Sequence, residues 1–285
     1  MRIVRTVEEM KVISRERRAR REQIGLVPTM GSLHEGHLSL VRASRARTGV
    51  TVVSVFVNPV QFGPREDLAS YPRDFDRDAA LLEAEGVDYV FHPEPSEMYP
   101  EGFRTYVEVR DLQDRLCGRS RPGHFRGVCT VVLKLFNIVR PNVAFFGWKD
   151  AQQVIILTRM AADLDLDVRI EGLPMVRDTD GLALSSRNGY LSAEERRAAL
   201  VLPRSLEDAR RLVEAGERDA GAVARRVTEA VAAEPLARLD YVDVADPKDL
   251  RPLDRIDGEA LVALAVFIGK TRLIDNVRIA PAGRG

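Results

Sequence analysis

The stretch IGLVPTMGSLHEGHLSLVRASR, residues 24–45, contains the features that decide the fold. It begins with a short apolar run, Ile24–Val27, which a proline ends, and this pattern is typical of a buried strand. A Gly-Ser turn follows, and from about Gly36 the spacing of Leu38 and Val41 predicts a helix. A strand that runs through a glycine turn into a helix is the repeating unit of an α/β domain.

The segments that follow extend this unit into a parallel sheet. Residues 50–57, VTVVSVFV, are rich in β-branched residues, as expected of a strand that is buried on both faces. Helices are predicted at 6–21, 75–85, 128–139 and 150–163, strands at 87–91, 143–146 and 167–173, and a short edge strand at 105–109. Helices and strands that alternate at this spacing predict an α/β fold, a Rossmann-like doubly wound parallel sheet.

The composition changes after Pro174 and indicates a second domain. Ser192 and Glu195 form a capping-box pattern at the start of another helix. Helices are predicted at 193–215 and 220–233, and strands at 239–244, 260–268 and 271–279. We therefore expect a domain of residues 1–175 and a smaller α+β domain of residues 176–285, of ordinary domain size.

The composition disfavours two classes of partner. The 285 residues are 45% hydrophobic and 30% charged, with a formal net charge of zero, as in an ordinary soluble globular protein. This balance argues against nucleic acid or a membrane surface as the main partner. Cys117 and Cys129 fit neither a disulfide framework nor a zinc pattern, so we expect reduced thiols and a cytoplasmic location.

His34 and His37 are half of the four histidines in the chain and invite a metal-site interpretation. The HEGH pattern resembles a zincin helix, but that motif separates its histidines by four positions and needs a third ligand. The remaining histidines, His92 and His124, are expected in unrelated loops. The pattern therefore argues against zinc.

An anion site explains the same residues better. Backbone N–H groups at a helix N-terminus point outward, and the helix dipole favours negative charge there. Gly31 and Gly36 allow an anion to approach the backbone, and His34 and His37 share a helix face. Open α/β sheets bind ligands at the carboxyl ends of their strands. The alternative is a solvated helix start, which two histidines and two glycines together make less attractive.

Six motifs, in order along the chain, carry a family resemblance. They are TMGSLHEGH (29–37), VFVNPVQFG (55–63), YPRDFDRD (71–78), RPGHFRGVCTVVLKLFNIVRP (121–141), FFGWKDAQQ (145–153) and DGLALSSRNGYLS (180–192). The HEGH segment is similar to the HIGH signature of nucleotidylyltransferases. The whole set resembles the pantothenate synthetase family, the pantoate–β-alanine ligases.

The resemblance implies a two-step ligase. Pantoate and ATP would form pantoyl-adenylate and pyrophosphate, and β-alanine would then displace AMP to form pantothenate. It implies His34, His37, Lys149 and Arg187 as catalytic residues that supply cations and N–H donors, because the α-phosphate and pyrophosphate accumulate negative charge. Mg²⁺ would arrive with the ATP phosphates, and no metal ligand is named. The second domain would close as a lid to protect the adenylate from water.

The resemblance also implies the binding residues. The ATP site would comprise Met30, Gly31, Ser32, Leu33, His34, Glu35, Gly36, His37, Gly147, Trp148, Lys149, Asp150, Val176, Leu184, Ser185, Ser186 and Arg187. Pantoate and β-alanine would contact Met30, Asn58, Gln61 and Gln153. Amides suit a hydroxyl-bearing acid because they donate and accept hydrogen bonds at once. The family resemblance also implies a homodimer, whereas sequence patterns alone do not determine the oligomeric state.

Three positions depart from the family pattern. Trp148 stands where the family usually has Glu, Ala151 replaces an aromatic residue, and Leu184 replaces Met. Trp148 and Ala151 are interpreted as a compensating exchange of one large side chain along the loop. The charged groups remain, so we expect an active enzyme.

The residues leave two alternative functions open. Another nucleotidylyltransferase, using CTP or ATP with a phosphorylated alcohol, would fit HEGH and SSRN but not NPVQFG and KDAQQ. A nucleotide-binding regulatory module without chemistry is disfavoured because the histidines, Lys149 and Arg187 are all retained.

Overall fold

A computed structural model describes residues 1–64 and 66–281, which divide into two compact units. The N-terminal unit comprises Met1–Gln113, Arg121–Trp148 and Ile156–Pro174, and the C-terminal unit comprises Asp114–Ser120, Lys149–Ile155 and Met175–Gly285. The main division falls after Pro174, while two short segments from the first 175 residues group with the C-terminal unit. The boundary expected after residue 175 stays a prediction about independently folding domains.

The N-terminal unit is built on a six-stranded parallel sheet in the order β1-β4-β3-β2-β5-β6. Its strands are β1 (Arg2–Val4), β2 (Ile24–Thr29), β3 (Val50–Val55), β4 (Tyr89–Phe91), β5 (Val143–Gly147) and β6 (Arg169–Leu173). Every residue of β3 is buried, as its continuous apolar pattern predicts. Since β2 to β6 follow the order 4-3-2-5-6 and all pair in parallel, the predicted Rossmann-like fold is confirmed.

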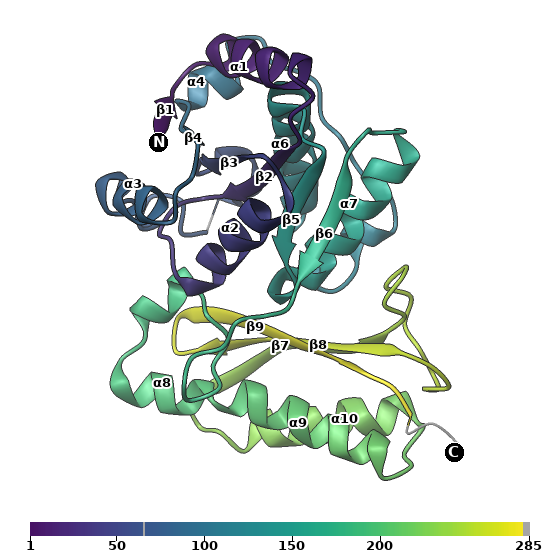
Figure 1. Cartoon of the computed structure of the whole chain (residues 1–285). Helices are drawn as coiled ribbons and strands as arrows, with labels where there is room; N and C mark the ends of the chain where they lie inside the picture. Colours follow the sequence, from purple (N-terminus) through teal and green to yellow (C-terminus); the bar gives the residue numbers. More distant parts are fainter. Residues whose placement is uncertain (65, 282–285) are drawn as a thin grey trace. The chain divides into compact units, whose positions relative to one another are not determined.

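Helices cover both faces of this sheet (Figure 1). In chain order, the helices before β6 are α1 (Val7–Ala19), α2 (Glu35–Arg47), α3 (Phe75–Ala84), α4 (Pro95–Met98), α5 (Cys117–Ser120), α6 (His124–Val139) and α7 (Ala151–Asp163). Of these, α5 lies in a segment that groups with the C-terminal unit. Single turns lie between them: η1 (Pro59–Gln61), η2 (Leu112–Asp114) and η3 (Trp148–Asp150). Helix α2 packs against β2, β3 and β5, while α1 and α6 pack together on the opposite face.

Two sequence predictions for the N-terminal unit were wrong. Residues 105–109 form no strand, because the N–H of Val107 donates to the Thr130 hydroxyl at 3.0 Å instead of to a neighbouring strand. Helix α6 begins at His124, four residues before the predicted start at residue 128. Apolar periodicity starts only at Val128, but the preceding polar turn is already helical.

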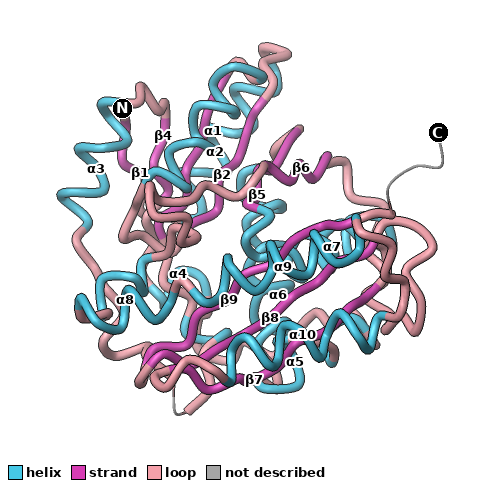
Figure 2. The backbone as a smooth tube through the Cα atoms, turned by 90° about the horizontal axis from the view of Figure 1, so that it is seen from below, coloured by secondary structure: helices cyan, strands magenta, loops and turns pink. Residues whose placement is uncertain are grey.

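The C-terminal unit consists of a small sheet and its covering helices. Strands β7 (Ala237–Ala245), β8 (Ala260–Ile268) and β9 (Thr271–Ile279) form an antiparallel meander. Helices α9 (Val201–Glu214) and α10 (Ala220–Ala232) run along this sheet (Figure 2) and bury its apolar side chains, while α8 (Ala193–Ala199) and η4 (Ser186–Tyr190) precede them. The predicted α+β organisation is confirmed.

One predicted helix, at 193–215, is two helices in the structure. Helix α8 ends at Ala199 and α9 begins at Val201, with Leu200 between them. Pro203 explains the break, since it has no N–H to donate to the carbonyl of Ala199. The capping box of Ser192 and Glu195 at the start of α8 is confirmed by reciprocal hydrogen bonds of 2.8 and 3.1 Å.

Candidate active site

The order of the parallel strands reverses direction at β2 and β5, which are neighbours in the sheet. The chain leaves the carboxyl end of β2 into residues 30–37, and that of β5 into Gly147 and Trp148. Such a switch point is where open α/β sheets bind ligands, because the loops diverge on either side and leave a crevice. Two of the segments predicted to bind ATP are therefore brought to the same edge of the sheet.

The two histidines at the start of α2 are held against each other. His34 is the N-cap residue, and its backbone N–H donates to Nδ1 of His37 at 3.4 Å. The ring centroids are 4.1 Å apart. Because Nδ1 of His37 accepts this bond, the proton of the neutral ring is on Nε2, and Nε2–H is the donor with which His37 is predicted to bind an anion.

A buried carboxylate orders the turn before the histidines, and the sequence did not single it out. Asp78 on α3 is 1% exposed and accepts the backbone N–H groups of Ser32, at 2.7 Å, and Leu33, at 2.8 Å. Ser32 needs this support, since its φ of 52° is unfavourable for a residue with a side chain. Burial raises the pKa of Asp78 above its ordinary value, although the two N–H donors act in the opposite direction.

We expect Asp78→Asn to slow adenylate formation by about tenfold, the scale of one hydrogen bond to a charged group. The amide NH₂ would face one of the two backbone N–H donors, so the turn would lose its ordered form. Single-turnover adenylate formation measures the effect. Asp76→Asn, at an exposed position of the same helix, is the matched control and should behave as wild type. Equal rates in the two variants would show that the turn does not depend on Asp78.

A buried amide network lies at the end of β3. The Asn58 side chain is 1% exposed, and its Nδ2 donates to Gln61 Oε1 at 3.0 Å and to the Gly127 carbonyl at 3.1 Å. Gln61 Nε2 in turn contacts Met30 Sδ at 3.0 Å. The Tyr99 hydroxyl donates to Asn58 Oδ1 at 2.8 Å, and burial raises the pKa of Tyr99, which keeps it a neutral donor. Asn58 therefore orients Gln61, and its own contact with substrate stays a prediction.

In the C-terminal unit, β9 supports the lysine that was predicted to be catalytic. Asn276 on β9 donates from its Nδ2 to the backbone carbonyl of Lys149 at 3.0 Å. The Lys149 ammonium lies 3.4 Å from the carboxylate of Asp150, the next residue. The two neighbouring glutamines differ: Gln152 is buried and bonds to the backbone of residues 115 and 117, whereas the predicted Gln153 is half-buried.

The remaining predicted ATP-binding residues lie on one hairpin of the C-terminal unit. The N–H of Leu184 donates to the carbonyl of Val176 at 3.1 Å, which brings together two segments that are eight positions apart in sequence. Ser185 caps the turn η4 and accepts the N–H of Arg187 at 3.3 Å. The next residue after Val176, Arg177, binds Asp275 on β9 through two hydrogen bonds of 2.7 and 2.8 Å.

Of the other two histidines, His92 lies in a loop, as predicted, whereas His124 lies in a helix. His92 directly follows β4, its Nδ1 is 2.7 Å from the Val55 carbonyl, and its ring stacks on Phe75. His124 is the first residue of α6 and contacts the carbonyl of Gln61. Among residues 1–64 and 66–281, no group of three or more His, Cys, Asp or Glu side chains could hold a metal ion. No helix in that part of the chain is long and apolar enough to cross a membrane.

Comparison with known proteins shows the family of the chain. Residues 2–278 match the family model described as pantoate–beta-alanine ligase. A pantothenate synthetase of Pelotomaculum thermopropionicum is 57% identical over 97% of this chain and 98% of its own length. That of Heliobacterium modesticaldum is 56% identical over 97% and 99%. The chain belongs to the pantoate–β-alanine ligase family. It is therefore an enzyme, a ligase that joins pantoate and β-alanine.

Two solved structures of pantoate–β-alanine ligases share the whole fold. The pantothenate synthetase of Thermus thermophilus superimposes with a TM-score of 0.94, at 47% identity, over 99% of this chain and 100% of the other. The ligase of Francisella tularensis, with a TM-score of 0.79 and 33% identity over 97% of both chains, was solved in complex with beta-gamma ATP and β-alanine.

The structure accommodates the large side chain of Trp148, one of the three positions predicted to depart from the family pattern. The indole of Trp148 lies directly over Gly172 of β6, where an added Cβ would come within 2.6 Å of the indole nitrogen. Gly172 therefore makes room for the large side chain. Ala151 is buried at the start of α7, and Leu184 is half-buried on the hairpin. The compensating exchange between positions 148 and 151 stays a prediction.

Proposed function

We propose that the ligase works in two steps and consumes ATP. In the first step a carboxylate oxygen of pantoate attacks the α-phosphate of ATP, which forms pantoyl-adenylate and releases pyrophosphate. In the second step the amine of β-alanine attacks the acyl carbon, and AMP leaves as pantothenate forms. The observation that carries this proposal is the pair of histidines at the N-terminus of α2, at the switch point of the sheet.

The residues of the site suit this chemistry. His34 and His37, with the N-terminal N–H groups of α2, would stabilise the negative charge on the α-phosphate. Lys149 and Arg187 would bind the departing phosphates, and the hydroxyls of Ser185 and Ser186 would add hydrogen bonds. Gln61, oriented by Asn58, would bind pantoate and β-alanine.

The other predicted contacts complete the two binding sites. Residues Met30 to Gly36, Gly147 to Asp150, Val176 and Leu184 would line the ATP site. Met30 and Gln153 would contact the acid substrates. The complex of the Francisella tularensis ligase with beta-gamma ATP and β-alanine supports both ligands.

Mg²⁺ would accompany ATP and reduce the charge of the phosphates. At the start of α2 the backbone N–H groups and the histidines suit phosphate oxygens rather than a metal ion, and the carboxylate of Glu35 is paired with Arg42. We propose that phosphate oxygens and water hold the ion, as is usual for Mg²⁺. A cytoplasmic location fits the two free, buried cysteines, Cys117 and Cys129.

Isotope exchange tests the two-step reaction. With pantoate alone, the enzyme should exchange labelled pyrophosphate into ATP, and with β-alanine alone it should not. With both acids, AMP and pantothenate should form in equal amounts, and chelation of Mg²⁺ should stop both reactions. Turnover with CTP and a phosphorylated alcohol, without pantoate-dependent exchange, would favour the rival nucleotidylyltransferase.

The lid and the homodimer are part of the same proposal. The C-terminal unit would close when ATP contacts Arg187, which would exclude water from the adenylate. Scattering in solution tests both points. Light scattering should measure twice the mass of the 31.8 kDa chain. Small-angle X-ray scattering should show a smaller radius of gyration with a non-hydrolysable ATP analogue, and an unchanged radius would contradict closure.

A further inference from the structure

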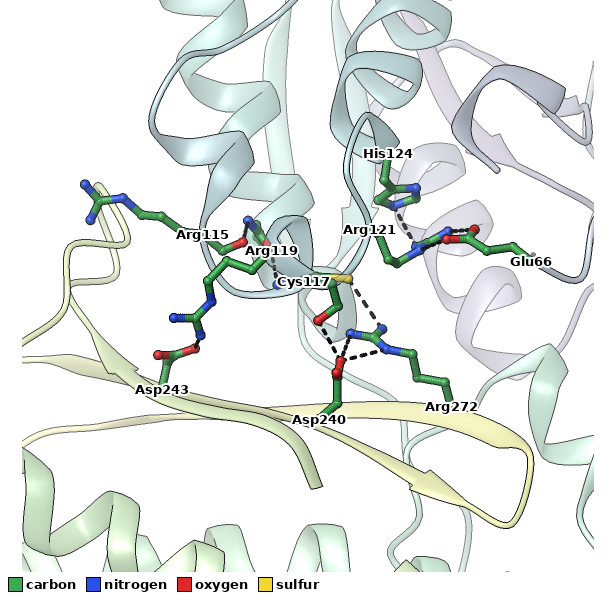
Figure 3. A network of polar contacts seen from close by, with 11 residues as sticks. Glu66, Arg115, Cys117, Arg119, Arg121, His124, Asp240, Asp243 and Arg272 are labelled. Carbon is green, nitrogen blue, oxygen red and sulfur yellow. Dashed lines mark hydrogen bonds and ion pairs between the residues drawn. The ribbon is translucent and has the colours of Figure 1, made fainter. Parts of the chain in front are cut away.

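Three side chains in the N-terminal unit, Glu66, Arg121 and His124, form a cluster (Figure 3). This cluster contacts the turn that carries Gln61. The Arg121 guanidinium binds Glu66 through two hydrogen bonds, of 2.8 and 2.5 Å. Its remaining terminal nitrogen lies 2.9 Å from Nε2 of His124. On the other side of the imidazole, Nδ1 lies 2.8 Å from the Gln61 carbonyl oxygen.

These contacts determine the proton position on His124. A guanidinium only donates hydrogen bonds, so Nε2 must accept, and the ring proton must be on Nδ1. The N–H at Nδ1 then donates to the carbonyl of Gln61. Glu66 holds Arg121 in this orientation. Burial alone raises the pKa of Glu66, but the Arg121 guanidinium outweighs it, and the pKa lies below its ordinary value.

The backbone around Gln61 is also packed tightly against α6. A Cβ on Gly127 would come within 2.6 Å of both the Gln61 Cα and the Val60 carbonyl oxygen. The Gly127 carbonyl in turn accepts the Asn58 amide at 3.1 Å. Helix α6 therefore holds the main chain of η1 through the bond from His124 to the Gln61 carbonyl. It also holds the side chain of Gln61, because Asn58 bonds to both the Gly127 carbonyl and the Gln61 amide. A small shift of the imidazole would move Gln61.

We propose that His124 is a positioning residue for the ligase reaction, which places Gln61 to bind the two acid substrates, and that Arg121 and Glu66 keep it in the required tautomer. The proposal rests on the proposed role of Gln61 in binding pantoate and β-alanine. A merely structural role predicts a different result, because a residue that only caps α6 would affect the stability of the fold without changing the affinity for one class of substrate.

Two amide variants of the full-length enzyme separate these roles. In His124→Asn, the side-chain amide takes the place of Nδ1 and can still donate to Gln61, but it loses the contact with Arg121. In His124→Gln, the amide takes the place of Nε2 and can still accept from Arg121, but it loses the bond to Gln61. The two variants are matched, since both introduce a polar side-chain amide that is no larger than the histidine side chain.

Steady-state kinetics give the test. We expect His124→Gln to raise the KM for pantoate and β-alanine about three- to tenfold, the effect of one lost hydrogen bond, and to leave the Kd of ATP unchanged. His124→Asn keeps the bond to Gln61, so it should raise these KM values less than His124→Gln does, even where its Tm falls. Equal KM values in the two variants, or a change only in ATP binding, would overturn the proposal.

Gln61→Ala distinguishes this inference from the proposed function. It should weaken the use of both acids and spare ATP. If Gln61→Ala weakens both acids but His124→Gln does not, only the positioning role of His124 fails. If Gln61→Ala leaves both KM values unchanged, the assignment of the acid site fails, and the proposal for His124 fails with it.

Discussion

Replacement of either His37 or Lys149 by alanine is expected to slow adenylate formation by about 10²–10³-fold, the usual effect of removing one donor that stabilises transition-state charge. His37 offers its Nε2–H because its Nδ1 accepts the backbone N–H of His34. Lys149 carries an ammonium group, and its backbone carbonyl accepts a hydrogen bond from Asn276 that fixes the main chain there. Single-turnover formation of pantoyl-adenylate measures the effect directly, before release of products contributes.

Conservative variants serve as controls for this prediction. His37→Gln should recover part of the rate, because its amide can donate near the position of Nε2. Lys149→Arg keeps the charge and should exceed Lys149→Ala. Thermal unfolding should change little in all four variants, since both side chains are partly exposed to solvent. Near-normal adenylate formation in both alanine variants would show that the phosphate site lies elsewhere.

The Arg177→Ala variant is expected to lose about 3 kcal/mol of unfolding free energy and to bind ATP more weakly. Asp275 is 1% exposed, and Arg177 neutralises it through two hydrogen bonds. Removal of the guanidinium leaves a buried carboxylate without its counter-charge, which typically costs about 3–5 kcal/mol. We expect the lower end of this free-energy range, because the side chain of Arg177 is itself one-third exposed to solvent.

Loss of this ion pair should also affect function through the hairpin. Arg177 connects the segment Val176–Arg187 to β9, and the neighbouring residue on β9, Asn276, donates a hydrogen bond to the backbone of Lys149.

Chemical denaturation measures the loss of stability in Arg177→Ala, and ATP titration measures the loss of ATP affinity. The double variant Arg177→Met/Asp275→Leu should recover stability, because both charges are removed together. Arg255→Ala, in the exposed pair with Asp257, should leave the Tm unchanged. Equal Tm losses in Arg177→Ala and Arg255→Ala would contradict the prediction.

The patterns that predicted the fold are local: either the burial of a continuous apolar run or contacts within one turn of a helix produces them. The continuous apolar run at residues 50–57 predicted a strand covered on both faces, and every residue of β3 is buried. The capping box of Ser192 and Glu195 needs only residues within one turn of each other, so it too was visible in the sequence. Residues 105–109 have the same β-forming character, but the partner of their backbone is a threonine side chain of α6.

By itself the sequence determined the α/β class, the second α+β domain and the family, and with them the histidine, lysine and arginine residues of the candidate site. Only the tertiary structure decided what holds these residues in place. Asp78 accepts N–H groups 45 and 46 positions away, His124 donates to a carbonyl 63 positions away, and Asp275 pairs with an arginine 98 positions away. The physical reason is that periodicity records which face of an element is buried, whereas the partner of a polar side chain depends on which distant segments the packed core brings into contact.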